Sequence, residues 1–193
     1  GYPIGSFLSW KVEPATSQQF RFYGFLRDYN ELNLRHNPQL DVPPTQNVKA
    51  VLDGQQRLTS LNIGLRGTYA YRNKYSWRAF AENYPARTLH LFLGGKAAEN
   101  TAGLEYDFRF LTKGQLEAMD EEESRLWFPV PAVYDADDFT GLWDEMAKRQ
   151  LGNDQQARQF VSTLWKRVHS DQSIYFYEET DQDIERVLDI FIR

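Results

Sequence analysis

The chain has 193 residues, of which 41% are hydrophobic and 15% aromatic, a composition that supports one globular domain rather than a disordered chain. It contains no cysteine, which excludes disulfides, cysteine-ligated metals and thiol nucleophiles and fits the reducing cytoplasm. The net charge of -5 and the absence of a Lys/Arg run argue against a surface that coats duplex DNA. The longest apolar runs fall short of the roughly 20 residues that span a membrane.

The first quarter of the chain carries both strand and helix signals. Residues 6–12, SFLSWKV, alternate in polarity and predict a strand with one well-buried face. Residues 18–34 predict a helix, because their apolar side chains recur at spacings of three, four and seven. After a proline-rich loop, residues 48–53, VKAVLD, predict a short apolar strand.

A helix is predicted to follow immediately after Asp53. Leu58, Leu61 and Leu65 recur at helical spacing, and glycines at 64 and 67 mark its end. Residues 88–94 and 106–112 predict two further strands, the second of which leads into a capping box.

The last third of the chain is predicted to be mainly helical. Residues 113–170 show two amphipathic stripes interrupted by an extended segment, WFPVPAVYD, and residues 172–179 return to strand alternation. Thr180, with Asp183 in the capping-box position, predicts the start of a final helix. Because strand signals flank residues 113–170, they are predicted to form a helical insertion within one α+β domain.

Five polar residues, DGQQR, lie between the strand at 48–53 and the helix that follows. The first amides of a helix have no intrahelical partner and carry a partial positive charge, so they attract phosphate. Gly54 removes a Cβ that would hinder close approach of a ligand, and Arg57 can fork onto phosphate oxygens. Gln55 and Gln56 can add neutral donors or position a water.

Asp53 fits this anion site less simply, since its carboxylate would repel a phosphate. A divalent cation such as Mg²⁺ could bridge the two, or Asp53 could orient an attacking water or hydroxyl. An ordinary structural interpretation is also open, in which Asp-Gly forms a cap and turn and the Gln and Arg side chains are exposed helix formers.

The run DGQQRLTSL at 53–61 resembles the signature of the DGQQR domain. This ParB/sulfiredoxin-like domain is found at the N-terminus of GmrSD-type modification-dependent restriction enzymes and related antiphage proteins. YPIGSFLSW, WFPVPAVYD and IERVLDIFIR, at 2–10, 127–135 and 184–193, resemble further segments of that family in the same order.

The resemblance implies a ParB/sulfiredoxin-like fold that binds, and often hydrolyses, a nucleotide. It also implies coupling to DNA restriction and an HNH-type nuclease domain further along the chain. Gly54 and Arg57 keep the Gly-x-x-Arg spacing of phosphate-binding turns in ParB and sulfiredoxin, and Arg193 matches the arginine of the family's IFxRxN helix. The rest of that motif and an upstream QR-x-Y-x-W segment are missing, so residues 1–193 are interpreted as a fragment truncated at both ends.

The leading hypothesis is therefore a nucleoside triphosphatase-type domain that uses Mg²⁺. It assigns catalysis to Asp53, Gln56 and Arg57, nucleotide binding to Gly54, Gln55, Arg57 and Arg193, and the metal to Asp53. The alternative is a non-hydrolysing module that senses modified DNA or a partner protein, with nucleotide as a switch or absent. Two weaker candidates are base stacking by Tyr2 and Trp10, and a metal or base role for Glu178 and Glu179.

Overall fold

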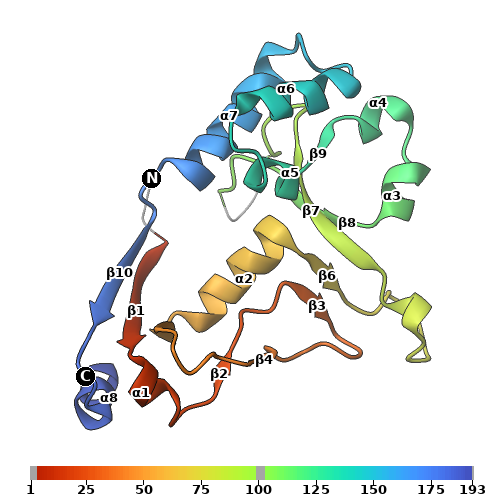
Figure 1. The fold of residues 1–193 in the computed structure, drawn as a ribbon. Coiled ribbons are helices and arrows are strands. Elements are labelled where there is room, and N and C mark those ends of the chain that lie inside the picture. The colour runs from red at the N-terminus through yellow and green to blue at the C-terminus, as the bar shows by residue number, and fades with distance from the viewer. Residues whose placement is uncertain (1–3, 99–102, 193) are drawn as a thin grey trace. The chain divides into compact units, whose positions relative to one another are not determined.

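The computed structural model describes residues 4–98 and 103–192, and it has the mixed helices and strands of the predicted α+β class (Figure 1). The chain divides into two compact units. Unit 1 consists of Gly1–Leu26, His36–Leu61 and Gln172–Arg193, and unit 2 of Arg27–Arg35 and Asn62–Asp171.

Unit 1 is built around β1 (Gly5–Val12), the middle strand of a three-stranded sheet. β5 (Val48–Asp53) pairs with it antiparallel, and β10 (Ile174–Glu179) pairs with it parallel. All three predicted strands are thereby confirmed. The polarity alternation of β1 understates its burial, because Phe7 and Ser9 on the opposite face are also buried.

The remaining elements of unit 1 are short, apart from the last helix. They are α1 (Pro14–Ser17), β2 (Phe22–Tyr23), β4 (Gln39–Leu40) and α8 (Ile184–Ile192). Strands β2 and β4 pair antiparallel. Trp10, Val12 and Val187 form the core of the unit, which therefore joins β1 to α8.

The predicted helix at residues 18–34 is wrong, because this segment forms β2 and then β3 (Asp28–Asn30). Its apolar side chains do not bury one common stripe. Phe22 packs against the core of unit 1, whereas Tyr29 stacks on Tyr69 in unit 2 with ring centroids 5.0 Å apart. Long-range strand pairing has overridden a helical spacing that arose by coincidence.

Unit 2 contains a sheet in the order β3-β6-β7-β8, with β9 also paired to β7. Its further strands are β6 (Thr68–Ala70), β7 (Ala86–Phe92), β8 (Phe108–Leu111) and β9 (Trp127–Pro129), and its 3-10 turn is η1 (Ala81–Asn83). The predicted strands at 88–94 and 106–112 correspond to β7 and β8.

The helices of residues 113–170 belong to the same unit as that sheet. They are α3 (Lys113–Ala118), α4 (Glu121–Ser124), α5 (Val130–Tyr134), α6 (Phe139–Lys148) and α7 (Gln155–His169). Both predicted amphipathic stripes pack into one core with Leu91, Leu93 and Phe128. The predicted capping box before α3 is confirmed, with Thr112 and Gln115 exchanging two hydrogen bonds of 2.9 and 3.0 Å.

The extended segment predicted at residues 127–135 is only partly present. It is a strand over Trp127–Pro129, but α5 begins at Val130. Pro131 does not prevent the helix because it lies in the first turn, where its missing N–H would have had no intrahelical acceptor.

Helix α2 (Gln55–Arg66) confirms the helix predicted after Asp53. Its residues up to Leu61 are assigned to unit 1 and those from Asn62 to unit 2. Gly64 does not end it but is buried inside it, where a Cβ would lie 3.4 Å from the Leu89 side chain. No helix in the described part of the chain is long and apolar enough to cross a membrane.

Burial of His90 on β7 makes a pH-dependent stability prediction possible. Burial lowers the pKa of its imidazole below the ordinary 6.5, partly offset by the hydrogen bond of Nδ1 with the Thr88 carbonyl. The unfolded chain therefore binds this proton more readily, so the contribution of His90 to stability is complete above pH 6.5 and is lost as the pH falls below it.

We expect urea unfolding to show a smaller loss of stability between about pH 7.5 and about pH 5.5 in His90→Asn than in the unmodified chain. The asparagine keeps a donor for the Thr88 carbonyl but does not titrate. The carboxylates contribute equally to the pH dependence of stability in both proteins. Parallel curves of unfolding free energy against pH would therefore contradict the prediction.

Candidate functional site

Gly54, at the junction of β5 and α2, begins the helix. Its φ of 87° lies in the left-handed region that favours glycine, and its carbonyl accepts the N–H of Leu58 at 3.0 Å. Gly54 rather than Asp53 is therefore the N-cap residue. The amides of Gln55, Gln56 and Arg57 precede the first intrahelical bond, and no described residue caps them.

The space beside Gly54 is used by the protein itself. A Cβ on this residue would lie 2.2 Å from Cδ1 of Phe7, a buried ring on the neighbouring strand β1. Glycine is thus required here both by its φ and by the packing of Phe7. A ligand would have to reach the turn from the side of the helix amides rather than through this position.

Arg57 is held by β1 in a defined orientation. Its Nη2 donates to the Ser6 carbonyl at 3.0 Å, its Nη1 to the Ile4 carbonyl at 3.4 Å, and its guanidinium carbon lies 4.5 Å from the centre of the Phe7 ring. The side chain is still 41% exposed, and Nη2 lies 3.6 Å from Oδ2 of Asp53. The guanidinium is therefore oriented by backbone carbonyls while part of it faces solvent.

The sequence patterns did not indicate that residues of β1 belong to this site. Gly5 has a φ of 124°, and a Cβ there would collide with Nη1 of Arg57. A glycine in an otherwise alternating strand, here at its first residue, is a signal for the close approach of another group. Here that group is the guanidinium of Arg57.

Asp53 is the last residue of β5 and its side chain is 61% exposed. No group of three or more His, Cys, Asp or Glu side chains that could hold a metal occurs among the residues the structure describes. The position is compatible with Mg²⁺ only if phosphate oxygens and waters complete the coordination. This is how Mg²⁺ commonly binds, with one or two carboxylates.

The two glutamines differ in their surroundings. Gln55 donates its side-chain amide to the Val51 carbonyl at 2.8 Å, which ties the first turn of α2 back to β5. The Gln56 side chain is exposed, and its backbone carbonyl accepts the Ser60 hydroxyl at 2.9 Å. Arg193 lies outside the described residues.

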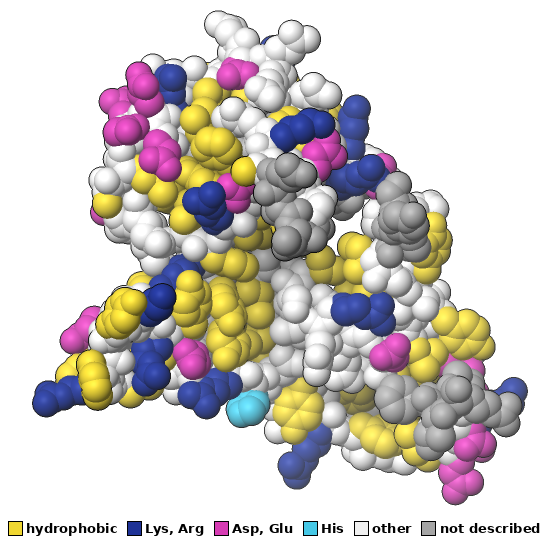
Figure 2. Space-filling view, turned by 180° about the vertical axis from the view of Figure 1, so that it is seen from behind, with side chains coloured by type: hydrophobic (Ala, Val, Ile, Leu, Met, Phe, Trp, Pro, Cys, Tyr) yellow, Lys and Arg dark blue, Asp and Glu magenta, His cyan; other side chains and the backbone are white. Residues whose placement is uncertain are grey.

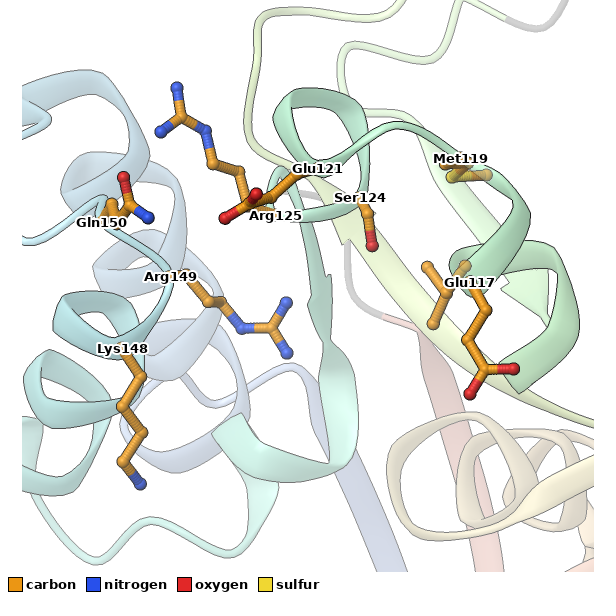
Figure 3. A pocket seen from close by; sticks show the side chains of 9 residues that line it. Glu117, Met119, Glu121, Ser124, Arg125, Lys148, Arg149 and Gln150 are labelled. Carbon is orange, nitrogen blue, oxygen red and sulfur yellow. The ribbon is translucent and has the colours of Figure 1, made fainter.

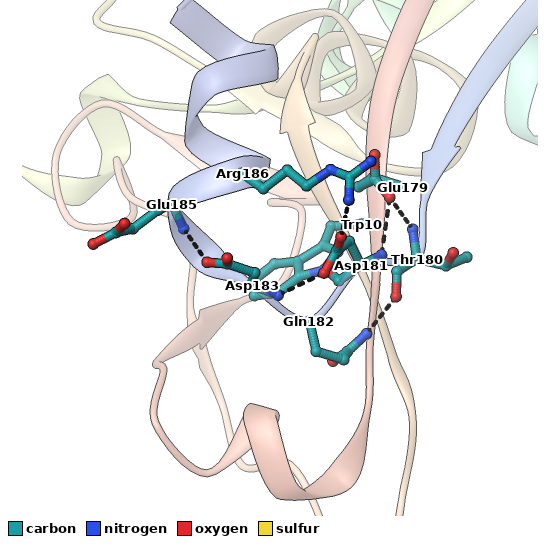
Figure 4. A network of polar contacts seen from close by, with 8 residues as sticks. All are labelled: Trp10, Glu179, Thr180, Asp181, Gln182, Asp183, Glu185 and Arg186. Carbon is teal, nitrogen blue, oxygen red and sulfur yellow. Dashed lines mark hydrogen bonds and ion pairs between the residues drawn. The ribbon is translucent and has the colours of Figure 1, made fainter.

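The final helix begins differently from the prediction, as Figure 4 shows. Asp183, not Thr180, caps α8: its carboxylate accepts the N–H of Glu185 at 3.0 Å, and its carbonyl accepts that of Val187 at 3.1 Å. The indole of Trp10 is buried beside this turn and donates to the Asp181 carbonyl at 2.7 Å. Trp10 is thus a core residue and not a base-stacking surface.

The other weak candidates also have structural partners. Glu178 pairs with Lys49 at 2.5 Å, and the carboxylate of Glu179 accepts the N–H groups of Thr180 and Asp181 at 2.8 and 2.9 Å (Figure 4). Both carboxylates thus have partners within the protein, and neither position requires a bound metal or ligand to explain it. Tyr2 lies outside the described part of the chain.

A polar hollow of about 390 Å³ lies in unit 2, between α3, α4 and the end of α6 (Figure 3). Arg125, Lys148 and Arg149 line it together with Glu117 and Glu121. Arg149 is already engaged, by the carboxylate of Glu145 at 3.1 Å and the carbonyl of Trp127 at 3.0 Å. The hollow therefore carries both signs of charge, and it includes none of the predicted site residues.

The fold and the turn define a class of protein: an α+β protein in which a strand leads through Asp-Gly into a helix whose first turn reads Gln-Gln-Arg. The family model for the GmrSD restriction endonuclease, N-terminal domain, matches residues 1–193, so the chain belongs to this family. Membership gives it a role in restriction, the defence of a cell against foreign DNA. No curated protein matches the chain.

Proposed function

We propose that the chain is a nucleotide-binding, Mg²⁺-dependent, NTP-hydrolysing regulatory domain of a DNA-restriction protein. The observation that carries the proposal is the placement of a fixed, partly exposed guanidinium beside an uncapped helix start. Nη2 of Arg57 lies 3.2 Å from the position that a Cβ on Gly54 would occupy.

The phosphate groups are proposed to bind at the first turn of α2. Three backbone amides there have no acceptor among the described residues, and the dipole of a 12-residue helix favours an anion at this end. Arg57 still has donors beyond those used by the carbonyls of Ile4 and Ser6. Because these two carbonyls already orient the guanidinium, less side-chain entropy is lost when it binds a phosphate.

Asp53 and Gln56 are proposed to act on the terminal phosphate. Asp53 would hold Mg²⁺, which when bound supplies positive charge for the phosphate oxygens. The exposed Gln56 amide would orient the attacking water, and Gln55 keeps the first turn attached to β5. Phosphoryl transfer depends mainly on such positioning and charge neutralisation.

Hydrolysis is proposed to control DNA cleavage by a nuclease domain of HNH type elsewhere in the protein. The competing proposal is a binding module in which nucleotide acts only as a switch. Asp53 belongs to no group of three or more metal-ligating side chains among the described residues, and this observation favours the second proposal.

The test is calorimetric titration of the intact protein with ATP and GTP, with and without Mg²⁺, together with phosphate release. We expect Mg²⁺ to strengthen binding, and Asp53→Asn to remove this effect without weakening the metal-free affinity, because the carboxylate repels phosphate when no metal is bound. A suitable control is Asp171→Asn, which removes a carboxylate that also pairs with an arginine four residues away, at 2.7 Å, but in α7 and the loop after it.

Each outcome separates the proposals. Binding without phosphate release, in the presence and absence of DNA, would support the switch. An Mg²⁺ effect that persists in Asp53→Asn would contradict the role given to this carboxylate. No nucleotide binding at all would leave Asp53 and Arg57 as a structural ion pair.

A further inference from the structure

The loop at residues 71–83, between β6 and β7, exposes four aromatic side chains, of which Tyr71 at its start is 41% exposed. Tyr75 is 85% exposed, Trp77 96% and Phe80 50%. Single exposed hydrophobic residues are ordinary on protein surfaces, but three large ones within six positions of one loop are an unusual concentration of exposed apolar area. This loop is called the aromatic loop below.

Polar side chains occupy the inside of the aromatic loop. The buried guanidinium of Arg87 donates to the side chain of Asn73 at 2.8 Å. The Asn83 side chain accepts the Ser76 hydroxyl at 3.1 Å and donates to the Arg78 carbonyl at 2.8 Å. The neutral polar side chains of the loop are therefore hydrogen-bonded within it, whereas its large aromatic side chains and its basic side chains are exposed.

The backbone of the aromatic loop also has a specific conformation. Tyr75 has a φ of 72°, a conformation that a bulky residue adopts only at an energetic cost. The Asn73 amide donates to the Asn83 carbonyl at 2.7 Å, which closes the base of the loop. The loop that carries the rings is thus held by specific backbone and side-chain hydrogen bonds.

Cations alternate with the aromatic rings. Nζ of Lys74 lies 5.5 Å from the centre of the Tyr75 ring, and the guanidinium carbon of Arg78 lies 5.9 Å from that of Phe80. Residues 72–82 contain three cations and only one carboxylate, in a chain whose net charge is -5. In Figure 2, hydrophobic and basic side chains, with a few acidic ones, intermingle at the lower left, the side to which the aromatic loop turns from its place in Figure 1.

An open hollow of about 510 Å³ adjoins the base of the aromatic loop. Tyr29, Tyr69, Tyr71 and Arg72 line it together with Glu31. Tyr69 stacks on Tyr29 and lies 5.5 Å from Tyr71 between ring centres, so these aromatic faces lead from the sheet into the loop.

We infer that the aromatic loop binds single-stranded DNA. Unpaired bases stack on the free faces of Trp77 and Tyr75, and the phosphates contact Lys74, Arg78 and Arg72. Aromatic faces alternating with cations suit this ligand because every base offers a flat π surface, and every linkage offers a negative charge. The inference is independent of the nucleotide site, which is formed by residues of unit 1 and is not required for it.

The test is fluorescence anisotropy of the intact protein with labelled oligothymidylate of about 20 nucleotides, long enough for one site, in the absence of nucleotide and Mg²⁺. We expect binding that is tighter than binding to a duplex of the same length. Trp77→Ala is expected to weaken it about tenfold, the loss of one stacked base. The matched control is Tyr175→Ala, which removes another exposed aromatic ring, in β10, and should leave the affinity for the oligonucleotide unchanged.

The charged residues have a separate readout. Lys74→Gln and Arg78→Gln are each expected to lower the slope of log affinity against log salt concentration by about 0.7. Lys113→Gln, which removes a lysine of α3 that is 90% exposed, should leave the slope unchanged.

Because Trp77 is almost fully exposed, Trp77→Ala should have the same thermal unfolding midpoint as the unmodified protein. A folded Trp77→Ala variant with unchanged DNA affinity would overturn the inference. Equal binding to single strand and duplex would overturn it as well. So would binding to vesicles of phosphatidylserine and phosphatidylcholine, or to a protein partner, without binding to DNA.

Discussion

Gly54→Ala is expected to lower the free energy of unfolding by about 2 to 5 kcal/mol. Of this, about 1–2 kcal/mol comes from an alanine at a φ of 87°, and about 1–3 kcal/mol from the collision of its Cβ with the Phe7 ring. The measurement is urea unfolding followed by circular dichroism. Nucleotide binding should weaken in parallel, because the first turn of α2 must move away from β1.

Two further variants separate the causes of that loss. In Gly54→Ala with Phe7→Leu, the smaller side chain relieves the collision but not the backbone strain, so the two changes should be less harmful together than their sum. Gly141→Ala is the control: it lies in α6, and nothing approaches its Cβ position within 4 Å. We expect it to stabilise the protein by about 0.5–1 kcal/mol, and additive effects of Gly54 and Phe7 would contradict the packing proposed here.

Arg57→Ala is expected to weaken nucleotide binding by roughly 10- to 100-fold, as expected for loss of a charge-assisted contact worth about 1.5–3 kcal/mol. It should also lower the free energy of unfolding by about 1–3 kcal/mol, because the carbonyls of Ile4 and Ser6 lose a charged donor. Affinity is measured by calorimetry at a temperature where circular dichroism shows the variant to be folded.

Arg57→Lys distinguishes a ligand contact from a purely structural one. A lysine keeps the charge but cannot donate to two carbonyls and a phosphate at once, so both affinity and stability should be intermediate. Arg167→Ala, which removes an arginine that pairs with Asp171 in a comparable way, is the control and should leave nucleotide binding unchanged. A folded Arg57→Ala with unchanged affinity would restrict Arg57 to its contacts with β1.

Much of the local structure around the candidate site follows from sequence patterns. The alternation of residues 6–12 and the apolar run at 48–53 are properties of single strands, and the leucine spacing after Asp53 is a property of one helix. These patterns correctly predicted β1, β5 and α2, as well as the capping box before α3. The run DGQQRLTSL identified the family because it is specific and uninterrupted.

The errors arise where a segment has partners far away in the chain. Residues 18–34 carry a helical spacing, but their side chains separate between two units, so no single stripe is buried. Thr180 had the right neighbours for a capping box, yet its backbone N–H bonds to Glu179 and the helix begins after Asp183. In both cases several local structures were similar in energy, and distant contacts selected one of them.

The sequence by itself determined that a strand, a glycine turn and a helix follow one another at residues 48–66, since periodicity and backbone freedom act between near neighbours. Only the tertiary structure decided what surrounds that turn. Phe7 fills the space beside Gly54, and the carbonyls of Ile4 and Ser6 orient Arg57, because β1 pairs antiparallel with β5 and brings residues some fifty positions away to the same corner. Pairing between strands depends on the whole chain, which is why the orientation of Arg57 could not be read from the motif alone.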